Sequence, residues 1–286
     1  MGKAAKLRKI RRLVLRWPVY LFLVAYTLFA LFPVVLMWIN ALKDPLEYKI
    51  EFNPLAFPKK ITLENLEKAW LVGHMGTYMR NSIIVAVPRV IGILILSSLA
   101  GYAFGKLRFP GMNTIFYLML FGMMIPIQAM LIPLYYNLQR IGMINNFWTM
   151  IVPNFGIMMP FAVFFMRSFF RDLPAELMDS ARIDGSNDFK AFVYIMLPLT
   201  TPALTTMMVL QFLWSWNDFL MPLMLIYEDK LRTLPLGIMF YLVGGYYLDQ
   251  GLVSAAVTIS SLPIICLYIV FQRSFVSGIT AGAIKG

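Results

Sequence analysis

Charged residues are scarce in this chain. They make up 14% of its 286 residues, whereas hydrophobic residues make up 60% and the mean hydropathy is +0.72. In soluble domains about a quarter of the residues carry a charge, so the composition excludes an ordinary soluble domain and indicates a membrane protein. Because a membrane-spanning helix needs roughly 20 apolar residues, the chain can hold about six spans. Such a length favours one subunit of a larger assembly.

Residues that hold metals or form disulfides are nearly absent. The chain has one cysteine, Cys266, and one histidine, His74, which excludes an internal disulfide and a His/Cys site for zinc or iron. It has no G-x-x-x-x-G-K-[ST] phosphate loop, so it cannot bind ATP in the usual way. The spans offer no nucleophile with a base, no filter sequence and no arginine ladder, which argues against an intramembrane enzyme or an ion channel. We expect no catalytic residue and no metal.

Acidic residues are few beside the basic ones, with 14 Asp and Glu against 25 Lys and Arg. Seven of the basic residues lie in segment 1–16, which contains no acidic residue. Basic residues ahead of a hydrophobic run orient a chain in the membrane and do not indicate nucleic-acid binding. We interpret 17–39 as an uncleaved first span with a cytoplasmic N-terminus, since no small-x-small cleavage site follows it.

Charge-free runs predict an all-α integral membrane protein, because backbone groups that face lipid must be satisfied within their own segment. Fifteen of the 25 basic residues fall in segments that a six-span topology places inside the cell, which agrees with two cytoplasmic termini. The predicted domains are a basic N-terminus at 1–16, a membrane domain at 17–273 with a cytoplasmic loop at 167–200, and a tail at 274–286. The predicted spans are 17–39, 82–104, 113–138, 145–166, 201–227 and 251–272.

Prolines at membrane depth predict kinked or broken spans. Such bends can be ordinary packing irregularities, or they can surround a cavity that opens to either side of the membrane. Gly101 and Gly105 are spaced for close contact between two helices of the bundle. The prolines concerned are Pro33, Pro88, Pro126, Pro133, Pro153, Pro160, Pro222 and Pro263.

The long external loop at 43–80 predicts one short helix. Thr62 can cap the first turn of a helix over 63–70. Leu63, Leu66 and Trp70 would then share an apolar side. We expect this helix to form a lid or an edge on the external face.

The loop between the fourth and fifth spans predicts a helix, a sharp turn and a second helix. Pro174 suits the first turn of a helix, and Gly185 suits its left-handed end. Ser186 or Asn187 can cap the second helix, which we expect to stop before Pro198.

Apolar and small residues in the first of these helices indicate a docking surface. Ala181 and Gly185 are small enough to let another protein approach the backbone. A small-residue tip between two short helices therefore predicts contact with a partner. The apolar side of the helix is formed by Leu173, Leu177, Ala181 and Ile183.

The spacing within this loop resembles a known family. Asp179-Ser180-Ala181 is followed after three residues by Gly185, after nine more by Ile195, and then by Leu197-Pro198. This resembles the EAA-x3-G-x9-I-x-LP loop of importer permeases in the ATP-binding cassette (ABC) class, with Asp179 for the family's first Glu and Ser180 for its first Ala. The run Trp214-Ser215-Trp216-Asn217-Asp218-Phe219 and the glycine-rich ending from Gly278 are similar to the carbohydrate-importing branch, in particular to the second permease subunit of the maltose-transporter type.

The resemblance implies a multi-pass permease subunit in a bacterial or archaeal cell membrane that imports a sugar, an oligosaccharide first of all, by alternating access. Import of glycerol phosphate, a polyol or an amino acid by the same machinery stays open. The implied partners are a second homologous permease, two cytoplasmic ATPase subunits that bind ATP and Mg, and an external sugar-binding protein. This chain itself would bind no cofactor. The residues implied to dock an ATPase are Glu176, Asp179, Ser180, Ala181, Asp184, Gly185, Ile195, Leu197 and Pro198.

The tail is too polar and glycine-rich to span the membrane and too short to fold alone. We therefore expect it to reach the ATPase subunits. The residues expected to make this contact are Gly278, Thr280, Ala281, Gly282 and Lys285.

Polar residues inside the fifth predicted span mark a candidate sugar path, because polar groups are costly at membrane depth. Asn217 and Asp218 lie between Trp214, Trp216 and Phe219, a mixture of hydrogen-bonding groups and flat aromatic faces that suits a sugar. Gln211 is a weaker candidate one turn earlier. The same residues could instead mark the membrane interface or cap a helix break at the outer surface.

Arg89 lies in the second predicted span, directly after Pro88. An arginine at the bilayer centre costs roughly 2.5–3.5 kcal/mol on insertion scales and needs a partner or water. Asp218 is the acidic residue at comparable depth, so the two can pair beside the path. Snorkelling of Arg89 toward the outer headgroups is the slightly favoured alternative.

Overall fold

The computed structural model describes residues 3–50, 53–241 and 249–283 of the chain, and these residues form helices joined by short connections, with no β-strand among them. The chain forms two compact units. One contains Met1–Gly73 and Tyr241–Ile259, and the other contains His74–Phe240 and Ser260–Gly286. The helix α14 (Gln250–Ala283) contributes to both units.

The smaller unit begins with a long helix, α1 (Lys3–Ala41), which contains the first predicted span and continues into the basic N-terminal segment. Two short helices follow, α2 (Pro45–Ile50) and α3 (Glu64–Leu71). Lys43, just before α2, and Ile61, just before α3, form an isolated antiparallel bridge. The loop predicted at 43–80 is therefore a folded part of the chain.

The larger unit contains the remaining described helices. The second to fourth spans are formed by α4 (Met75–Lys106), by α5 (Met112–Phe121), the 3-10 turn η1 (Gly122–Met124) and α6 (Ile127–Arg140), and by α7 (Phe147–Asp172). The loop after α7 is formed by α8 (Glu176–Ile183), α9 (Asp188–Ala191), the π-helix η2 (Phe192–Met196) and α10 (Leu197–Leu199). The chain then passes through α11 (Thr201–Trp216), α12 (Leu220–Leu225), η3 (Asp229–Leu231) and α13 (Leu234–Tyr241).

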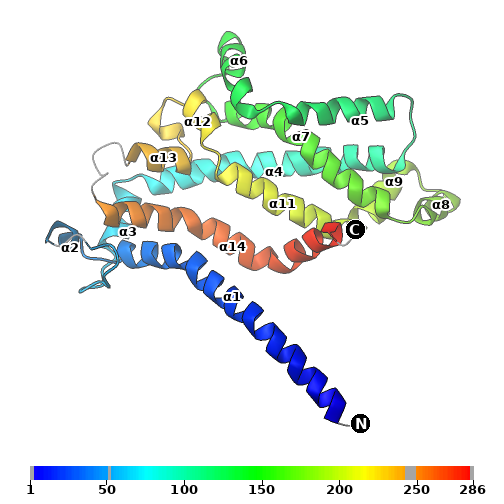
Figure 1. Cartoon of the computed structure of the whole chain (residues 1–286). Helices are drawn as coiled ribbons and strands as arrows, with labels where there is room; N and C mark the ends of the chain where they lie inside the picture. Colours follow the sequence, from blue (N-terminus) through cyan, green and yellow to red (C-terminus); the bar gives the residue numbers. More distant parts are fainter. Residues whose placement is uncertain (1–2, 51–52, 242–248, 284–286) are drawn as a thin grey trace. The chain divides into compact units, whose positions relative to one another are not determined.

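Four helical segments are long and apolar enough to cross a membrane, and the number is six if each of two bent pairs counts as one span. The four are Trp17–Ala41, Met75–Lys106, Phe147–Asp172 and Gln250–Arg273. In the first bent pair, Met112–Met124 meets Ile127–Arg140 at 97°, and Figure 1 shows α6 turning away from α5. In the second, Asp188–Leu199 meets Thr201–Trp216 at 76°. An all-helical chain with four to six spans is thus the observed architecture.

The breaks fall at only some of the predicted prolines. Pro126 ends the first half of the third span and is the N-cap of α6, so its missing N–H breaks the helix as expected. The fifth predicted span, 201–227, is wrong at its end, because α11 stops at Trp216 and α12 starts at Leu220. The prolines that lie inside continuous helices are Pro33, Pro88, Pro133, Pro153, Pro160 and Pro263.

Helices α4 and α7 pack closely in the larger unit, and Figure 1 shows them side by side with α11 alongside α4. A Cβ atom on Gly101 would lie 2.7 Å from the Cβ of Met166, and one on Gly105 would lie 3.1 Å from the Cβ of Phe170. Both distances are too short for comfortable contact, so a side chain at either glycine would push the helices apart. The predicted role of this glycine pair in helix contact is confirmed.

The helix α3 buries a side other than the apolar side that its sequence indicates. Thr62 accepts a hydrogen bond from the Glu64 amide at 3.2 Å, but the N-cap position belongs to Leu63, which gives no side-chain cap. The buried residues are Asn65 and Ala69, whereas the predicted apolar side, with Leu63 and Trp70, is exposed. The Asn65 amide donates to the backbone carbonyls of Ala41 and Lys43, which turns the Asn65 side of α3 inward.

Candidate docking loop and membrane ion pair

The first helix of the loop after α7 ends in the predicted sharp turn. Gly185 has φ +77°, the left-handed conformation that favours glycine. Its amide donates to the Arg182 carbonyl at 3.0 Å, and the Ser186 amide donates to the Ala181 carbonyl at 2.9 Å. These two bonds form a Schellman motif. A Cβ atom on Gly185 would meet nothing within 4 Å, so the turn is an open tip.

The second helix starts at the predicted place and ends differently. Of the two candidate caps, Asn187 is the one used, and its side chain accepts from the Lys190 amide at 2.8 Å. We predicted that this helix stops before Pro198. It instead continues through η2 and α10 and bends at Thr200. Pro198 is tolerated because it occupies the first turn of α10, where a missing N–H costs little.

Burial corrects the docking side of α8. Ala181 is 3% exposed and packs with Met178 in the core, so it cannot offer its backbone to a partner. Ile183, predicted on the same side as Ala181, is 86% exposed, because two residues along a helix differ by more than half a turn. Ile195 and Leu197 pack partly against the core. The predicted docking residues that remain exposed are Glu176, Asp179, Ser180, Asp184, Gly185 and Pro198.

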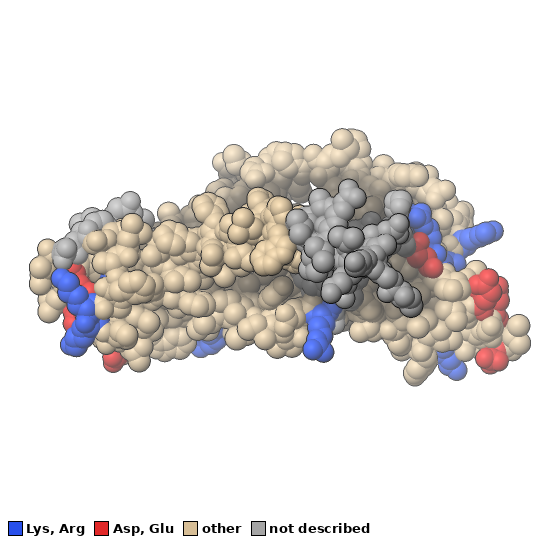
Figure 2. Space-filling view, turned by 60° about the horizontal axis from the view of Figure 1, so that its bottom comes forward, with Lys and Arg blue, Asp and Glu red and all other residues tan. Residues whose placement is uncertain are grey.

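Charged side chains gather around this loop. Figure 2 shows red and blue atoms at its right-hand edge, the side on which Figure 1 places α8, and a mostly uncharged surface next to them. A cavity of 610 Å³ beside α8 is lined by Lys106 and Arg108, from the end of α4, and by Asp179, Arg182 and Asp188, from the loop. The two basic residues after α4 thus belong to the same surface as the loop, which the spacing of the loop motif could not indicate.

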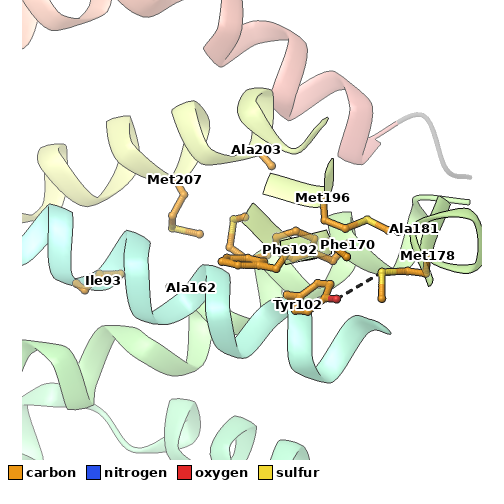
Figure 3. Close-up of a cluster of buried hydrophobic side chains, with 12 residues drawn as sticks. Ile93, Tyr102, Ala162, Phe170, Met178, Ala181, Phe192, Met196, Ala203 and Met207 are labelled. Atoms are coloured by element: carbon orange, nitrogen blue, oxygen red, sulfur yellow. Dashed lines mark hydrogen bonds between the residues drawn. The ribbon is translucent and has the colours of Figure 1, made fainter. Parts of the chain in front are cut away.

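Tyr102 of α4 joins both loop helices and was missed by the sequence analysis. Its hydroxyl donates to the carbonyl of Asp188 at 3.0 Å and lies 3.4 Å from the sulfur of Met178. Figure 3 shows its ring among Phe170 and Phe192, with the dashed line to Met178. The side chain is 4% exposed. A hydroxyl near the end of an apolar span was the signal available, since a buried polar group needs a partner.

Arg89 and Asp218 form an ion pair, with 2.9 Å between the guanidinium and a carboxylate oxygen. The side chains are 3% and 14% exposed. The favoured expectation that Arg89 reaches the headgroups is therefore wrong, and the alternative of a pair with Asp218 is the arrangement found. Pairing satisfies a charge that would otherwise be stranded in an apolar surrounding.

The pair lies at the break between α11 and α12. Asn217 is the C-cap of α11, and its side chain donates to the Leu213 carbonyl at 2.9 Å. The other oxygen of Asp218 accepts from the Met221 amide at 3.4 Å. The alternative that Asn217 and Asp218 mark a helix break thus describes their local structure.

The remaining candidate path residues divide by burial. Trp216 is 1% exposed, and its indole N–H donates to the Ser260 carbonyl at 3.1 Å. Gln211 is 2% exposed and contacts the sulfur of Met207. Trp214 is 40% exposed and packs edge-on against Phe161. Only Trp214 and Asn217 present a large free surface.

The described residues of the predicted tail lie in the helix α14. Gly278, Thr280, Ala281 and Gly282 lie in α14, which runs to Ala283. Lys285 lies outside the described residues. The helix α14 thus extends beyond the last predicted span, 251–272, without a break.

Over the described ranges, no group of three or more His, Cys, Asp or Glu side chains could hold a metal ion.

Comparisons with known proteins agree on the kind of molecule. The family of binding-protein-dependent transport system inner membrane components matches residues 93–281. The diacetylchitobiose uptake system permease protein NgcG of Streptomyces coelicolor is 31% identical over 92% of this chain and 87% of its own. The arabinooligosaccharides transport system permease protein AraQ of Halalkalibacterium halodurans is 34% identical over 96% of this chain and 98% of its own.

A solved structure shows the same fold. It is a bacterial ABC transporter involved in the import of the acidic polysaccharide alginate, with a TM-score of 0.72 and 24% identity over 96% of this chain and 99% of that one. Together with four to six helical spans, these likenesses describe a multi-pass protein of the cell membrane that acts as a transport subunit and is not an enzyme. The chain belongs to the family of binding-protein-dependent transport system inner membrane components.

Proposed function

We propose that this permease imports an oligosaccharide, together with a second homologous permease, two cytoplasmic ATPase subunits and an external binding protein. The observation that carries the substrate class is the similarity to permeases of uptake systems for diacetylchitobiose and arabino-oligosaccharides. The ATPase subunits supply ATP and Mg binding, since this chain has no phosphate loop.

The ATPase docks on the α8–α9 loop. The observation that supports this docking is the open left-handed tip at Gly185, with exposed polar residues of α8 beside it. Asp179 and Asp184 lie on this exposed surface beside Arg182, and Lys106 and Arg108 line the cavity next to it, so a groove that carries charges of both signs would complement it. The cytoplasmic side of the membrane then follows as the side of α8, and both chain termini share it in a six-span topology.

The sugar passes the break between α11 and α12. Trp214 offers an aromatic face and Asn217 a carboxamide, and both are exposed at this break. Arg89 and Asp218 bind each other, so they support the wall of the sugar path and offer no free charge to the sugar. A neutral sugar needs stacking and hydrogen bonds more than charge, which agrees with this division.

The tail reaches the ATPase subunits through the end of α14. Deletion of the last eight residues is expected to change basal ATP hydrolysis by the assembled complex and to leave expression intact. Unchanged hydrolysis and unchanged transport would contradict a role of the tail in the ATPase contact.

The substrate class is tested with the complete complex in proteoliposomes, with its external binding protein added. ATP hydrolysis is measured with diacetylchitobiose, arabino-oligosaccharides, glycerol phosphate and a mixture of amino acids. We expect an oligosaccharide to stimulate hydrolysis. If only glycerol phosphate or an amino acid stimulates hydrolysis, that solute and not an oligosaccharide is the substrate. The proposed assembly would stand, because the same subunits would then carry a different solute.

The path is tested by Trp214→Ala and Asn217→Ala. Each is expected to raise the sugar concentration needed for half-maximal transport, because a stacking face or a hydrogen-bonding group is lost. Trp148→Ala serves as the control, since Trp148 is an exposed tryptophan of another helix, α7. If Trp214→Ala and Asn217→Ala both behave like the wild type, the sugar does not pass this break.

A further inference from the structure

We propose that α4 is held at both ends and moves as one body with α11. At one end Tyr102 binds the loop helices α8 and α9, and at the other end Arg89 binds Asp218, just after α11. These three residues are the positioning residues of what we call the clamp. The inference rests on the proposed docking of an ATPase at the α8–α9 loop. It adds the route by which a displacement of that loop reaches the middle of the membrane. None of these three residues needs to touch the sugar or the ATPase for this role.

The clamp at the loop end is the Tyr102 hydroxyl. It bonds the Asp188 carbonyl at the start of α9 and lies against Met178 of α8, so one side chain of α4 holds both loop helices. Its ring is fixed by Phe170, at 5.7 Å between ring centroids, and by Phe192, at 5.1 Å. Because these contacts leave the ring no alternative place, a movement of the loop must carry this end of α4 with it.

The clamp at the other end is the ion pair between Arg89 and Asp218. Arg89 and Tyr102 lie on the same helix, and 13 residues of helix between them span roughly 20 Å. This segment contains no proline, since Pro88 lies just beyond it. It is one unbroken stretch of α-helix and can therefore act as a rod between the loop and the break after α11.

The chain itself offers a second route from the loop to Asp218, and that route is irregular at two points. It passes the π-helix η2, and it bends by 76° where α10 meets α11. Irregular turns and bends can absorb a displacement before it reaches the far end. The rod formed by α4 bypasses both points, and so it can transmit a movement that the chain route would lose.

The two routes form a closed circuit. One side runs along α4 from Tyr102 to Arg89, and the other runs from Asp188 through η2, α10 and α11 to Asp218. Opening either clamp breaks the circuit, and opening the second after the first should add little. This non-additivity distinguishes a clamp from two separate stabilising contacts.

The test uses the assembled complex with Cys266→Ser and with Asn217→Cys as a reporter at the break. The rate of modification by a membrane-impermeant thiol reagent is measured before and after trapping the ATPases with MgATP and vanadate. In the otherwise unchanged chain, trapping should alter the rate by about fivefold or more, the range of typical coupling between sites.

Tyr102→Phe removes only the clamp hydroxyl and keeps the ring. We expect the trapping-dependent change to shrink by about twofold or more, where twofold is the low end of the net worth of one hydrogen bond, while the amount of trapped nucleotide stays the same. Tyr117→Phe is the matched control, because Tyr117 is 67% exposed on α5. It should leave the change intact.

The other clamp is opened by the double variant Arg89→Leu/Asp218→Leu, which strands no charge. It should shrink the change as Tyr102→Phe does, and all three substitutions together should do no more. The clamp would be overturned if Tyr102→Phe traps nucleotide and still shows the full change in modification rate. It would also be overturned if the effects of the two clamp variants multiply in the triple variant. Failure of the unsubstituted complex to trap nucleotide would instead overturn the docking proposal on which the clamp rests.

Discussion

The external loop and the loop after α7 each contain a helix of eight residues, α3 and α8. Each helix buries two residues about one turn apart, Asn65 and Ala69 in α3 and Met178 and Ala181 in α8. Each carries acidic residues in its first turn, where they complement the helix dipole. As sequences the two helices are thus alike.

The difference lies in what holds each helix. The buried Asn65 amide ties α3 to the carbonyls of Ala41 and Lys43, within its own unit. By contrast, α8 is tied through Met178 to Tyr102 of a membrane-spanning helix, and its end leads through Gly185 into α9 and α11. A helix anchored on its own loop is a local structure, whereas one anchored on a span can pass on a movement.

The largest expected effect is that of a bulky residue at the tip beside α8. Gly185→Trp forces a left-handed conformation on a non-glycine residue, a strain of about 1–3 kcal/mol, and fills the open tip. We expect the complex to lose most of its ATPase subunits during purification in detergent. The measurement is the ratio of ATPase to permease after affinity purification.

Gly142→Trp is the matched control, because Gly142 also has positive φ, at +67°, and open surroundings. It lies in a different connection, after α6. We expect it to keep the ATPase ratio of the wild type. Equal losses in both variants would mean that strain, and not docking, explains the result.

A smaller effect is expected from the anchor of α3. Asn65→Leu leaves the carbonyls of Ala41 and Lys43 without their donor, at a cost of about 1–3 kcal/mol. Amide hydrogen exchange in α3 should speed up accordingly, while the ATPase ratio stays the same. Glu67→Gln on the exposed side of α3 should change neither, and a loss of ATPase in Asn65→Leu would contradict the local character of this helix.

The cap of α9 gives a smaller effect again. Asn187→Ala removes the side chain that accepts from the Lys190 amide and should destabilise the start of α9 by about 1 kcal/mol. Ser186→Ala is the control, since Ser186 was the other candidate cap and Asn187 is the one used. Hydrogen exchange at the Lys190 amide should rise in the first variant alone. Equal exchange in both variants would contradict the capping role of Asn187.

The smallest effect concerns the exposed pair of Lys68 and Glu64 in α3, with 2.6 Å between their charged atoms. The hydrogen bond to Glu64 raises the pKa of Lys68 above its usual 10.5. A raised lysine pKa stabilises the fold below that value and loses its contribution as the pH rises through the folded pKa. Lys68→Met should therefore cost only about 0.2–0.5 kcal/mol near neutral pH, and the difference from the wild type should disappear above pH 10.5. A difference that grows at high pH would contradict this sign.

Local turn chemistry was predictable where one residue type alone fits a backbone conformation. Gly185 is an example, because only glycine adopts a left-handed conformation without strain, and its place at the end of α8 is confirmed. The end of the second loop helix was not predictable in the same way. Pro198 forbids an N–H bond but does not forbid a helix that uses a π-turn upstream.

Amphipathic sides were harder to predict in short helices. Ala181 was expected at a docking surface and lies in the core, and α3 buries Asn65 and Ala69 while Leu63 and Trp70 of its apolar side are exposed. In eight residues a helix makes only about two turns, so one anchoring bond can rotate the pattern. Asn65 supplies such a bond in α3, and its two partners lie more than twenty residues away.

The sequence by itself determined that the chain is a helical membrane protein, because hydrophobic length and unpaired backbone groups leave no other structure in lipid. It also determined the family, through the spacing of one loop. Only the tertiary structure decided that Arg89 binds Asp218 and that Tyr102 joins the loop to α4. Those partners are 129 and 86 residues apart along the chain, and which distant polar groups meet depends on how the helices pack, a property that no local pattern contains.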